Sequence, residues 1–588
     1  MKRKYLAFLA LLMAMALVAT ACPQQQRQQQ GEDGDGEEQT GANFNGWNNE
    51  EATKLMQDSD RELDEAARVE MFQRIGELSR EDVASIPLYA KPTILMWNIA
   101  RLGPDLDFNG GQTGFSHEIA KWELLSGDTT TLRFGAEQWP DCLNPITTCA
   151  NSSWAYWLQG GVYPLLMLAD NENNYTPSPL VASVPNEEDG TLTTDPFTVT
   201  YELNEMNWED GTPITGEDIK FTWEAIMNTP NAISTVGYDK IEDIVTDGNK
   251  VTISFTEPYA PWRDLFSTGA PCCILKKAAF ESTDLSEALA DEVPFAGGPY
   301  RLTSFSESEI IWEANPGFSP APSIEKVIFI NLQEGGQQDE VTKLRTGEID
   351  AAFPQPADPI KELVEAGDDD NFAVKIKGGT QYEGLWFNLD MFPVNDRSVR
   401  EALLQLLDRQ APIDSVFGWT EAAGFKTEVN HCLFNVPFVS GGQWCNEDFP
   451  TEPDQEAAKQ ALLDGGWTPF DADGNEIAEA DFDTALEEAT LNIWRNEDGQ
   501  PLTLKFGTTA GNTGREATQL ILIQQMVAFG IDARTDNSPA GFLFQTRHPA
   551  RDWTMLEYAS VAPIDPTITA NWAGDQIPPC ETCPGEPG

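Results

Sequence analysis

Residues 207–223 read NWEDGTPITGEDIKFTW, and this stretch decides how the rest of the sequence is interpreted. Its Asp-Gly pair is typical of a tight turn. The residues that follow predict a helix over residues 218–228, and Thr215 is suited to cap it. Asp218, three positions after Thr215, provides a weaker relative of the capping box. The stretch therefore predicts a hairpin turn that leads directly into a helix.

Strand and helix patterns alternate on both sides of this stretch. Residues 129–134 (TTTLRF), 197–203 (FTVTYEL) and 251–255 (VTISF) alternate in the way that half-buried strands do. Farther along, strand patterns alternate with helices expected at VREALLQLLDR (residues 399–409) and over residues 515–529. We find no internal repeat. The alternation predicts an α/β fold.

The front of the sequence carries a long helical pattern over residues 48–80. Its apolar positions at helical spacing are Leu63, Ala67, Met71, Ile75 and Leu78. Pro87 ends the pattern, and the residues after it, LYAKPTILMWN, are expected to be extended. We therefore expect one long helix followed by an extended segment.

The charge balance is strongly acidic, with 95 Asp and Glu against 37 Lys and Arg and a formal net charge of -58. Such a surface repels nucleic acid phosphates and anionic lipids, so neither is expected as a partner. The 17 Trp and 30 Phe supply large cores, which distinguishes the chain from a disordered polyanion. Two explanations of the acidic charge stay open: it keeps the protein soluble, or it reflects adaptation to a salty habitat. The length of 588 residues suggests about two to four domains.

Residues 1–22, MKRKYLAFLALLMAMALVATAC, have the basic start and apolar middle of an export signal rather than of a spanning helix. The end of this segment resembles a bacterial lipobox, in which small residues precede a Cys that is acylated. We therefore expect a lipid on Cys22 that holds the protein at the outer face of the cytoplasmic membrane. Ordinary signal-peptidase cleavage is the alternative. Residues 23–42 are polar and rich in Gln and Glu, so we expect a flexible tether.

The chain has nine Cys, and export permits disulfides. Three pairs close short rings and are expected to be disulfides: Cys142 with Cys149, Cys432 with Cys445, and Cys580 with Cys583. A zinc site is the alternative for the last pair, but the three His are widely scattered, and a tetrahedral site needs further ligands nearby. We therefore expect no metal. Cys272 and Cys273 are left unassigned, because a bond between neighbours is strained.

Residues 207–227, NWEDGTPITGEDIKFTWEAIM, resemble the signature of the family 5 extracellular solute-binding proteins. These are the oligopeptide-, dipeptide- and nickel-binding receptors of ABC importers. Their signature is roughly W-x-D-G-x-P-[LI]-T-A-x-D-V-x-[FY]-[ST]. The matching residues are Trp208, Asp210, Gly211, Pro213, Thr215, Asp218, Phe221 and Thr222. Gly216 stands where the family usually has Ala.

Further blocks of the same pattern follow in the family's order. Residues 295–300 (FAGGPY) and 312–316 (WEANP) are similar to its turn-and-strand block and its "RNPxYW" element. Residues 344–350 (LRTGEID) are close to its L-x-x-G-E-I-D, and residues 387–409 resemble the long block that ends in "AIDR". Residues 552–566 match its late "DW...DP" region. On these blocks the chain is identified as a member of the family.

The family's C-terminal pattern stands at the front of this chain. Residues 43–89 resemble that pattern, yet they precede residues 129–134, which resemble the family's N-terminal strand. This order indicates a circular permutation, with the old ends joined over residues 124–128. Domain termini often lie at the surface and close together, so such a permutation is tolerated. A misassembled reading frame is the alternative.

The resemblance implies an α/β fold of the two-lobed periplasmic-binding-protein kind, with an extra subdomain on the first lobe and the ligand between the lobes. The lobes close on the ligand by a hinge motion. The expected parts are the signal (1–22), the linker (23–42), a second-lobe segment (43–91), a crossover with the permutation joint (92–128), the first lobe with its subdomain (129–375), the rest of the second lobe (376–572) and a loop tail (573–588).

The resemblance also implies ligand-binding residues. Asp565, in the late block, matches the carboxylate that holds a peptide's terminal amine in the family, because a buried charge must be paired. Trp386 and Asn388 lie just before the hinge-proximal block and are expected to line the cleft. The alternatives are a structural role for Asp565 and core packing for Trp386. The loop after the first strand supplies Asn151, Ser153 and Trp154, and the weaker candidates are Trp139 and Tyr558.

We therefore expect a monomeric, lipid-anchored receptor that captures peptides or a similar small solute and delivers them to an ABC permease, without a cofactor. A sugar or metal complex is an alternative ligand, although the scarcity of His weighs against nickel. An extracellular hydrolase is the alternative class of function. It would need a nucleophile with its base or a positioned carboxylate pair. The sequence contains neither G-x-S-x-G nor H-E-x-x-H, so we expect no catalytic residue.

Overall fold

The computed structural model describes residues 41–111, 113–268, 272–290, 292–365, 371–434, 442–580 and 583. All of them belong to one unit, Gln39–Gly588. The export signal, Cys22 and most of the predicted tether lie outside the described residues. In the part of the chain that the structure describes, no helix is both long and apolar enough to cross a bilayer.

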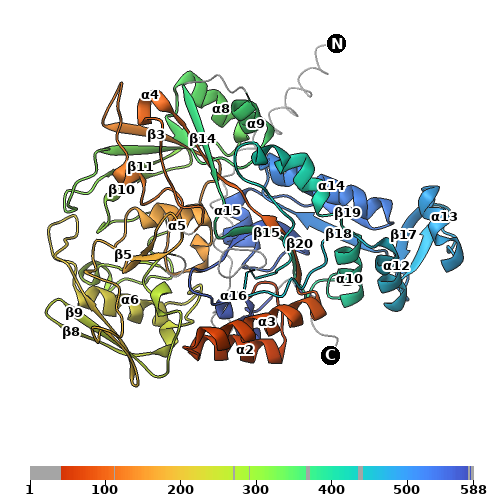
Figure 1. Cartoon of the computed structure of the whole chain (residues 1–588), viewed down its shortest axis with the longest axis horizontal. Coiled ribbons are helices and arrows are strands. Elements are labelled where there is room, and N and C mark those ends of the chain that lie inside the picture. The colour runs from red at the N-terminus through yellow and green to blue at the C-terminus, as the bar shows by residue number, and fades with distance from the viewer. Residues whose placement is uncertain are drawn as a thin grey trace, which may run out of the picture. The chain divides into compact units, whose positions relative to one another are not determined.

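A seven-stranded sheet organises the first lobe (Figure 1). Its strands, in sheet order, are β10 (Tyr300–Phe305), β11 (Glu309–Ala314), β12 (Lys326–Asn331), β3 (Thr131–Ala136), β13 (Ala351–Ala352), β2 (Thr93–Asn98) and β14 (Phe372–Lys377). β3 runs parallel to β12 and β13, whereas β2 is antiparallel to both of its neighbours. The helices of this lobe are α4 (Ile99–Leu102), α5 (Ser153–Gly160), α7 (Lys277–Phe280), α8 (Gly336–Thr346) and α9 (Asp358–Glu365).

A subdomain, residues 167–268, extends this lobe and shares its hydrophobic core. It contains a four-stranded antiparallel sheet and a small hairpin. Its elements are β4 (Met167–Ala169), β5 (Tyr175–Pro177), β6 (Leu192–Thr194), β7 (Phe197–Glu202), β8 (Ile241–Asp247), β9 (Lys250–Phe255) and α6 (Gly216–Asn228). The predicted cap is confirmed, because the Thr215 backbone N–H donates to the Asp218 carboxylate over 2.9 Å. α6 begins two residues earlier than predicted.

A five-stranded sheet organises the second lobe. Its strands, in sheet order, are β1 (Ser85–Ala90), β15 (Gln381–Phe387), β20 (Met555–Val561), β18 (Thr503–Gly507) and β19 (Asp532–Thr535). The remaining elements are α2 (Glu50–Arg61), α3 (Glu65–Asp82), α10 (Arg397–Leu406), α11 (Gln410–Pro412), α12 (Gln455–Asp464), α13 (Phe482–Glu487), α14 (Thr513–Ala528), α15 (Ala540–Phe542), α16 (Thr569–Trp572) and the hairpin β16 (Thr468–Asp471) with β17 (Leu491–Arg495). The two sheets and their helices confirm the predicted α/β fold.

The front of the described chain packs into the second lobe. Residues 44–89 share one hydrophobic core with residues 382–573. Figure 1 shows the red helices α2 and α3 beside the blue α16, and Gly574 N–H donates to Thr53 Oγ1 over 2.8 Å. β1 is the edge strand that pairs with β15. Segments that are far apart in the sequence therefore pack side by side in the second lobe.

The expected single helix over residues 48–80 is wrong, because the structure has two helices with a break at Glu62 to Asp64. Asp64 caps the second helix by accepting from Ala67 N–H over 2.9 Å. Leu63, which fits the apolar spacing, lies in the break and is 43% exposed. The apolar periodicity alone did not reveal this cap, because Asp64 starts a new helix within an otherwise continuous apolar pattern.

Two neighbouring segments connect the lobes. Lys91 and Pro92 join β1 to β2, and residues 378–380 join β14 to β15. The two segments lie side by side, since Lys91 N–H donates over 3.1 Å to the backbone oxygen of Gln381, the first residue of β15. A Cβ placed on Gly379 would lie 2.3 Å from the backbone oxygen of Gly110, so this close approach requires glycine. We call these segments the crossing segments.

The three predicted disulfides are confirmed. Their Cα atoms are 5.7 Å apart for Cys142–Cys149, 6.1 Å for Cys432–Cys445 and 5.4 Å for Cys580–Cys583. The last pair is a disulfide rather than the alternative zinc site. The pair left unassigned by sequence, Cys272 and Cys273, is also bonded, so every Cys in the described ranges is paired.

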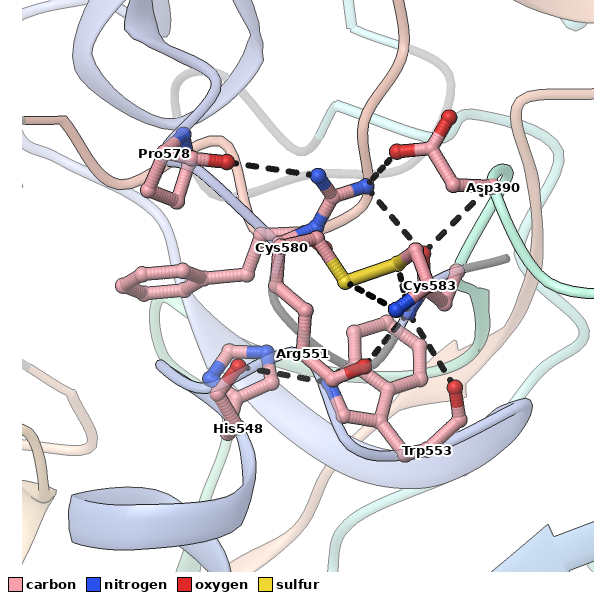
Figure 2. Close-up of a disulfide and its surroundings, with 9 residues drawn as sticks. Asp390, His548, Arg551, Trp553, Pro578, Cys580 and Cys583 are labelled. Carbon is pink, nitrogen blue, oxygen red and sulfur yellow. Dashed lines mark hydrogen bonds and ion pairs between the residues drawn. A yellow bond between two sulfur atoms is a disulfide. The ribbon is translucent and has the colours of Figure 1, made fainter. Parts of the chain in front are cut away.

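The Cys580–Cys583 disulfide lies beside a buried arginine (Figure 2). Arg551 donates to the backbone oxygens of Phe44 and Pro578 over 3.0 and 3.3 Å and also forms an ion pair with Asp390. Because its partners come from the front, the middle and the end of the chain, this one side chain ties those three segments together.

Candidate functional site

A cavity of about 350 Å³ lies between the two lobes. The first lobe contributes the loop before α5, the subdomain contributes Asp264, and the crossing segments contribute Lys91. The second lobe contributes residues of β15, β20 and α16. Such a volume falls within the range of small-molecule sites.

A second hollow, of about 410 Å³, lies between α6 and residues 277–285. Its lining residues come from α6, α7 and the segments that follow those two helices, all within the first lobe and its subdomain. Closure of the lobes would therefore not enclose a molecule there, and the cavity between the lobes is the better candidate site.

The loop before α5 supplies the first-lobe wall. Ser152 caps α5 by accepting from Ala155 N–H over 3.2 Å, which fixes the residues on either side. Asn151, Ser153 and Trp154, all predicted ligand contacts, line the cavity. Trp154 Nε1–H donates to Glu137 Oε1 over 3.3 Å, so its ring orientation is set by a second cavity residue.

Aromatic rings form the second-lobe wall. Trp386 and Tyr558, both predicted, line the cavity with their ring centroids 5.2 Å apart. Trp386 Nε1–H donates to the Tyr558 backbone oxygen over 2.8 Å. A Cβ on Gly384 would lie 2.7 Å from the Trp386 ring, so glycine lets the indole lie over its own strand. The other rings of this wall are Phe44, Phe544, His548 and Trp572.

His548 is a neutral member of this aromatic wall. Its Nε2 is 3.0 Å from the Tyr558 hydroxyl, and its ring centroid is 4.7 Å from that of Phe44. Burial lowers the pKa of His548 to about 3. The wall therefore carries no imidazolium charge at neutral pH.

The cavity end at the crossing segments is charged, and its charged groups bond to one another or to neighbouring amide side chains. Arg515, at the start of α14, donates from Nε and Nη2 to the Glu383 carboxylate over 3.0 and 2.9 Å. Lys91 Nζ donates to Gln381 Oε1 over 3.1 Å, and burial followed by the charge of Arg515 lowers the pKa of Lys91 to about 8. Glu137 accepts from Gln355 Nε2–H over 2.6 Å, and burial raises its pKa.

The subdomain side of the cavity holds a carboxyl group with an unsatisfied oxygen. Asp264 follows Trp262 in a short turn of the subdomain. Its Oδ2 atom is buried and has no hydrogen-bond partner. Burial raises the pKa of Asp264 well above the ordinary value, and the charges of Asp565 and Asp60 raise it further.

Asp565, expected to hold a ligand amine, does not line the cavity in this structure. Its two oxygens accept from Arg263 Nε and Nη2 over 2.8 and 2.7 Å. Because Arg263 belongs to the subdomain, this ion pair joins the two lobes. A second pair across the same seam joins Arg61 to Glu257 over 2.7 Å.

Two other predicted residues also lie outside the cavity lining. Asn388 is fully buried, and its Nδ2–H group donates to the backbone oxygens of Arg551 and Trp553 over 2.7 and 3.2 Å. Trp139 packs in the first-lobe core and donates to the Ser306 backbone oxygen over 3.0 Å. Both side chains therefore hold their own lobe together instead of facing the cavity.

The lobes touch at other points around the cavity. Gln545 accepts from Asp141 N–H over 2.6 Å and donates to the Cys142 backbone oxygen over 3.1 Å. Thr513 donates to Gln337 Oε1 over 2.9 Å. With the Arg263–Asp565 pair, these bonds connect the lobes at several points in a closed arrangement.

Sequence reasoning missed the charged residues of the cavity, namely Lys91, Glu137, Asp264 and Arg515. Lys91 carried one usable signal, since it lies between two extended segments that the resemblance assigns to different lobes. Asp264 carried none, because it is one of 95 acidic residues and stands outside the recognised blocks. In the described ranges no group of three or more His, Cys, Asp or Glu side chains is placed to hold a metal ion.

Comparison with known proteins gives a family match. The sequence model of the bacterial extracellular solute-binding proteins, family 5 (middle), matches residues 176–573. The probable monoacyl phosphatidylinositol tetramannoside-binding protein LpqW of Mycobacterium tuberculosis is 26% identical over 218 residues, which are 36% of this chain and 33% of that protein. A putative ABC transporter peptide-binding protein of Brucella ovis is 25% identical over 240 residues, 39% of this chain and 43% of that protein. The matches thus span less than half of these relatives.

Solved structures agree with this match at the level of the fold. The oligopeptide-binding protein AppA from Bacillus subtilis, solved in complex with a nonapeptide, superimposes with a TM-score of 0.59. The superposition covers 75% of this chain and 84% of AppA, at 17% sequence identity. At this identity the likeness concerns the two-lobed fold alone.

Proposed function

This chain belongs to family 5 of the bacterial extracellular solute-binding proteins, and we propose that it is a lipid-anchored receptor that captures a short peptide or a solute of similar size for an ABC permease. The observation that carries this proposal is the cavity of about 350 Å³ lined by both lobes and by the crossing segments. A ligand there contacts both lobes at once. Its binding energy therefore favours the closed arrangement.

The cavity chemistry supports a small amphipathic ligand. The aromatic wall offers apolar contact, and the polar groups of Asn151, Gln355 and Gln381 offer a few directional hydrogen bonds. The volume lies near the lower end of the range for ligand sites, about 300–1,000 Å³. We therefore propose a short peptide rather than a long one, with a sugar as the second candidate.

We also propose that the chain is circularly permuted relative to its family. The packing of residues 44–89 into the second-lobe core supports this idea. The two sequence ends of the described fold meet, since Asn43 N–H donates to Gln576 O over 3.0 Å. Residues 125–130, at the proposed joint, are exposed. Joining residue 580 to residue 43 by a short linker and opening the chain at residue 126 should preserve cooperative unfolding and ligand affinity. Loss of both would contradict the permutation.

The function is tested by thermal unfolding of residues 23–588 with dipeptides to pentapeptides, sugars and metal salts. A ligand that binds only the folded state raises its stability by about 2.7 kcal/mol at a hundredfold excess over Kd. A shift with peptides supports the proposal, and a shift with sugars alone would favour the second candidate. Cooperative unfolding that no solute changes would contradict solute capture at this cavity.

A further inference from the structure

The subdomain end of the cavity contains a carboxyl group without a partner. Asp264 lines the cavity, and its Oδ2 atom is buried and accepts no hydrogen bond. A buried carboxylate that lacks a partner is costly, and native proteins rarely leave one unsatisfied. Asp264 is therefore a candidate partner for a positively charged ligand group.

The neighbouring cations do not supply that partner. Arg263 is engaged by Asp565 in a bidentate ion pair. Arg68 donates to the backbone oxygens of Ser59 and Pro566. Among the described residues, no cation forms an ion pair with Asp264. Its surroundings are in fact acidic, since Asp60 and Asp565 both act on it.

Aromatic residues line the same cavity as this carboxyl group. Tyr238 and Tyr259 line the cavity from the subdomain, and Trp386 and Tyr558 line it from the second lobe. Tyr and Trp faces attract cations through their ring quadrupoles. A cavity lined by a carboxylate and by aromatic rings is therefore suited to a positively charged group that carries an apolar body.

We propose that Asp264 is the cation-binding residue of the cavity, and that the ligand carries an ammonium or guanidinium group on an apolar or aromatic body. This inference rests on the proposed function, because it names the ligand chemistry of the same cavity. The positive group would pair with the Asp264 carboxylate where that side chain lines the cavity. The apolar body would pack on the rings of the second-lobe wall.

A linked proton follows from the surroundings of Asp264. The groups that act on it are Asp60 of α2, Arg68 of α3, and Asp565 in the segment after β20, and its own turn adds Arg263, which pairs with Asp565. With its pKa raised well above the ordinary value of about 3.9, the empty carboxyl holds its proton to higher pH. A bound ammonium lowers that pKa again, so binding releases a proton. The affinity for a cation therefore increases as the pH rises through the raised pKa.

The test uses residues 23–588 and matched pairs of ligands that differ only in the positive group. The probes are tyramine with N-acetyltyramine, and the dipeptide Phe-Tyr with N-acetyl-Phe-Tyr. We expect the charged member of at least one pair to bind and its acetylated partner to bind at least tenfold more weakly. Tyramine binding identifies free amines as ligands, whereas binding of Phe-Tyr alone identifies the peptide amino terminus.

Variants separate the inference from the function on which it rests. Asp264→Asn should weaken binding of the charged probe by about 100-fold, as expected when one partner of a buried charge pair is lost. It should also abolish proton release, measured by calorimetry in buffers of different ionisation enthalpy. Arg534→Met, at an exposed ion pair outside the cavity lining, should leave proton release unchanged. Cooperative thermal unfolding shows that each variant is folded.

Three results would overturn the inference. Equal binding of charged and acetylated probes would do so, as would unchanged affinity in Asp264→Asn. In both cases solutes still bind, so the proposed function stands. Failure of the unmodified protein to bind these probes or any peptide, sugar or metal salt would overturn the function and the inference together.

Discussion

The two charged ends of the cavity differ in how their charges are paired. At the crossing segments, Arg515 and Glu383 form a bidentate ion pair inside the second lobe. At the subdomain end, Asp264 Oδ2 has no partner and is flanked by further acids. The Arg515–Glu383 pair is complete without a ligand, whereas Asp264 has no paired cation among the described residues. We infer that charge at the crossing segments serves the fold, whereas charge at the subdomain end serves recognition.

This difference has opposite consequences for stability. Removal of one member of a satisfied buried pair leaves the other member charged and unpaired, which is strongly destabilising. Removal of a charge that is already unpaired relieves a cost instead. The same kind of substitution should therefore have opposite signs at the two ends of one cavity.

The largest effect is expected at the crossing segments. Arg515→Met should lower the free energy of unfolding by about 3–5 kcal/mol, because Glu383 would remain buried without its partner beside Glu557. Denaturant unfolding measures the change. Arg534→Met is the matched control, since Arg534 pairs with Asp532 at an exposed position and should show no measurable change. Equal losses of unfolding free energy in the two variants would contradict a structural role for the Arg515–Glu383 pair.

Asp264→Asn should act in the opposite direction. Without ligand at neutral pH, it should raise the free energy of unfolding by about 1–3 kcal/mol, the cost of an unsatisfied buried polar group. The sign follows from the raised pKa of Asp264, because a raised carboxyl pKa means that the folded state disfavours the charge. The gain should shrink as the pH falls and the wild-type carboxyl takes up its proton. Thermal unfolding at several pH values measures it, and a destabilised variant at neutral pH would contradict an unpaired Asp264.

The fold was largely predictable from the sequence, because it depends on local signals. The turn and cap around Thr215 and the alternating strands of the subdomain each follow from a few neighbouring residues. The break between α2 and α3 was missed, because an Asp cap inside a periodic pattern is a weaker signal than the pattern itself.

The site was predictable only in part. Asn151, Ser153, Trp154, Trp386 and Tyr558 were named from the family resemblance, and all of them line the cavity. Asp565 and Asp264 show the limit of that approach. Both are acidic residues at one seam, and only the fold determines that Arg263 reaches the first and leaves the second without a partner.

His548 gives a pH test of the aromatic wall. Burial lowers the pKa of His548 to about 3 in the folded state, against about 6.5 in the unfolded chain. The contribution of His548 to the free energy of unfolding is therefore fully present above about pH 6.5. That contribution is lost as the pH falls from about 6.5 towards 3. His548→Gln should reduce the pH dependence of the unfolding free energy there by about 1.4 kcal/mol per pH unit, the value for one proton. His117→Gln is the comparison, because His117 lies outside the wall and its pKa is also lowered, to about 4. Its loss should reduce the pH dependence only between about pH 6.5 and 4. An unchanged slope in His548→Gln would show that the ring is accessible to protons when folded.

The smallest effect is expected at the seam between the lobes. Asp565→Asn removes the ion pair with Arg263, whose side chain is 37% exposed, so the change in stability should be about 1 kcal/mol or less. The pair joins the lobes, and its loss should therefore shift the ligand-free protein towards an open form. Small-angle scattering without ligand would detect a larger radius of gyration, and saturating ligand should restore the closed value. Glu257→Gln, which removes the Arg61 pair across the same seam, should cause a similar opening. If Asp565→Asn abolished ligand binding in the closed protein while Asp264→Asn did not, the roles assigned to the two carboxylates would have to be exchanged.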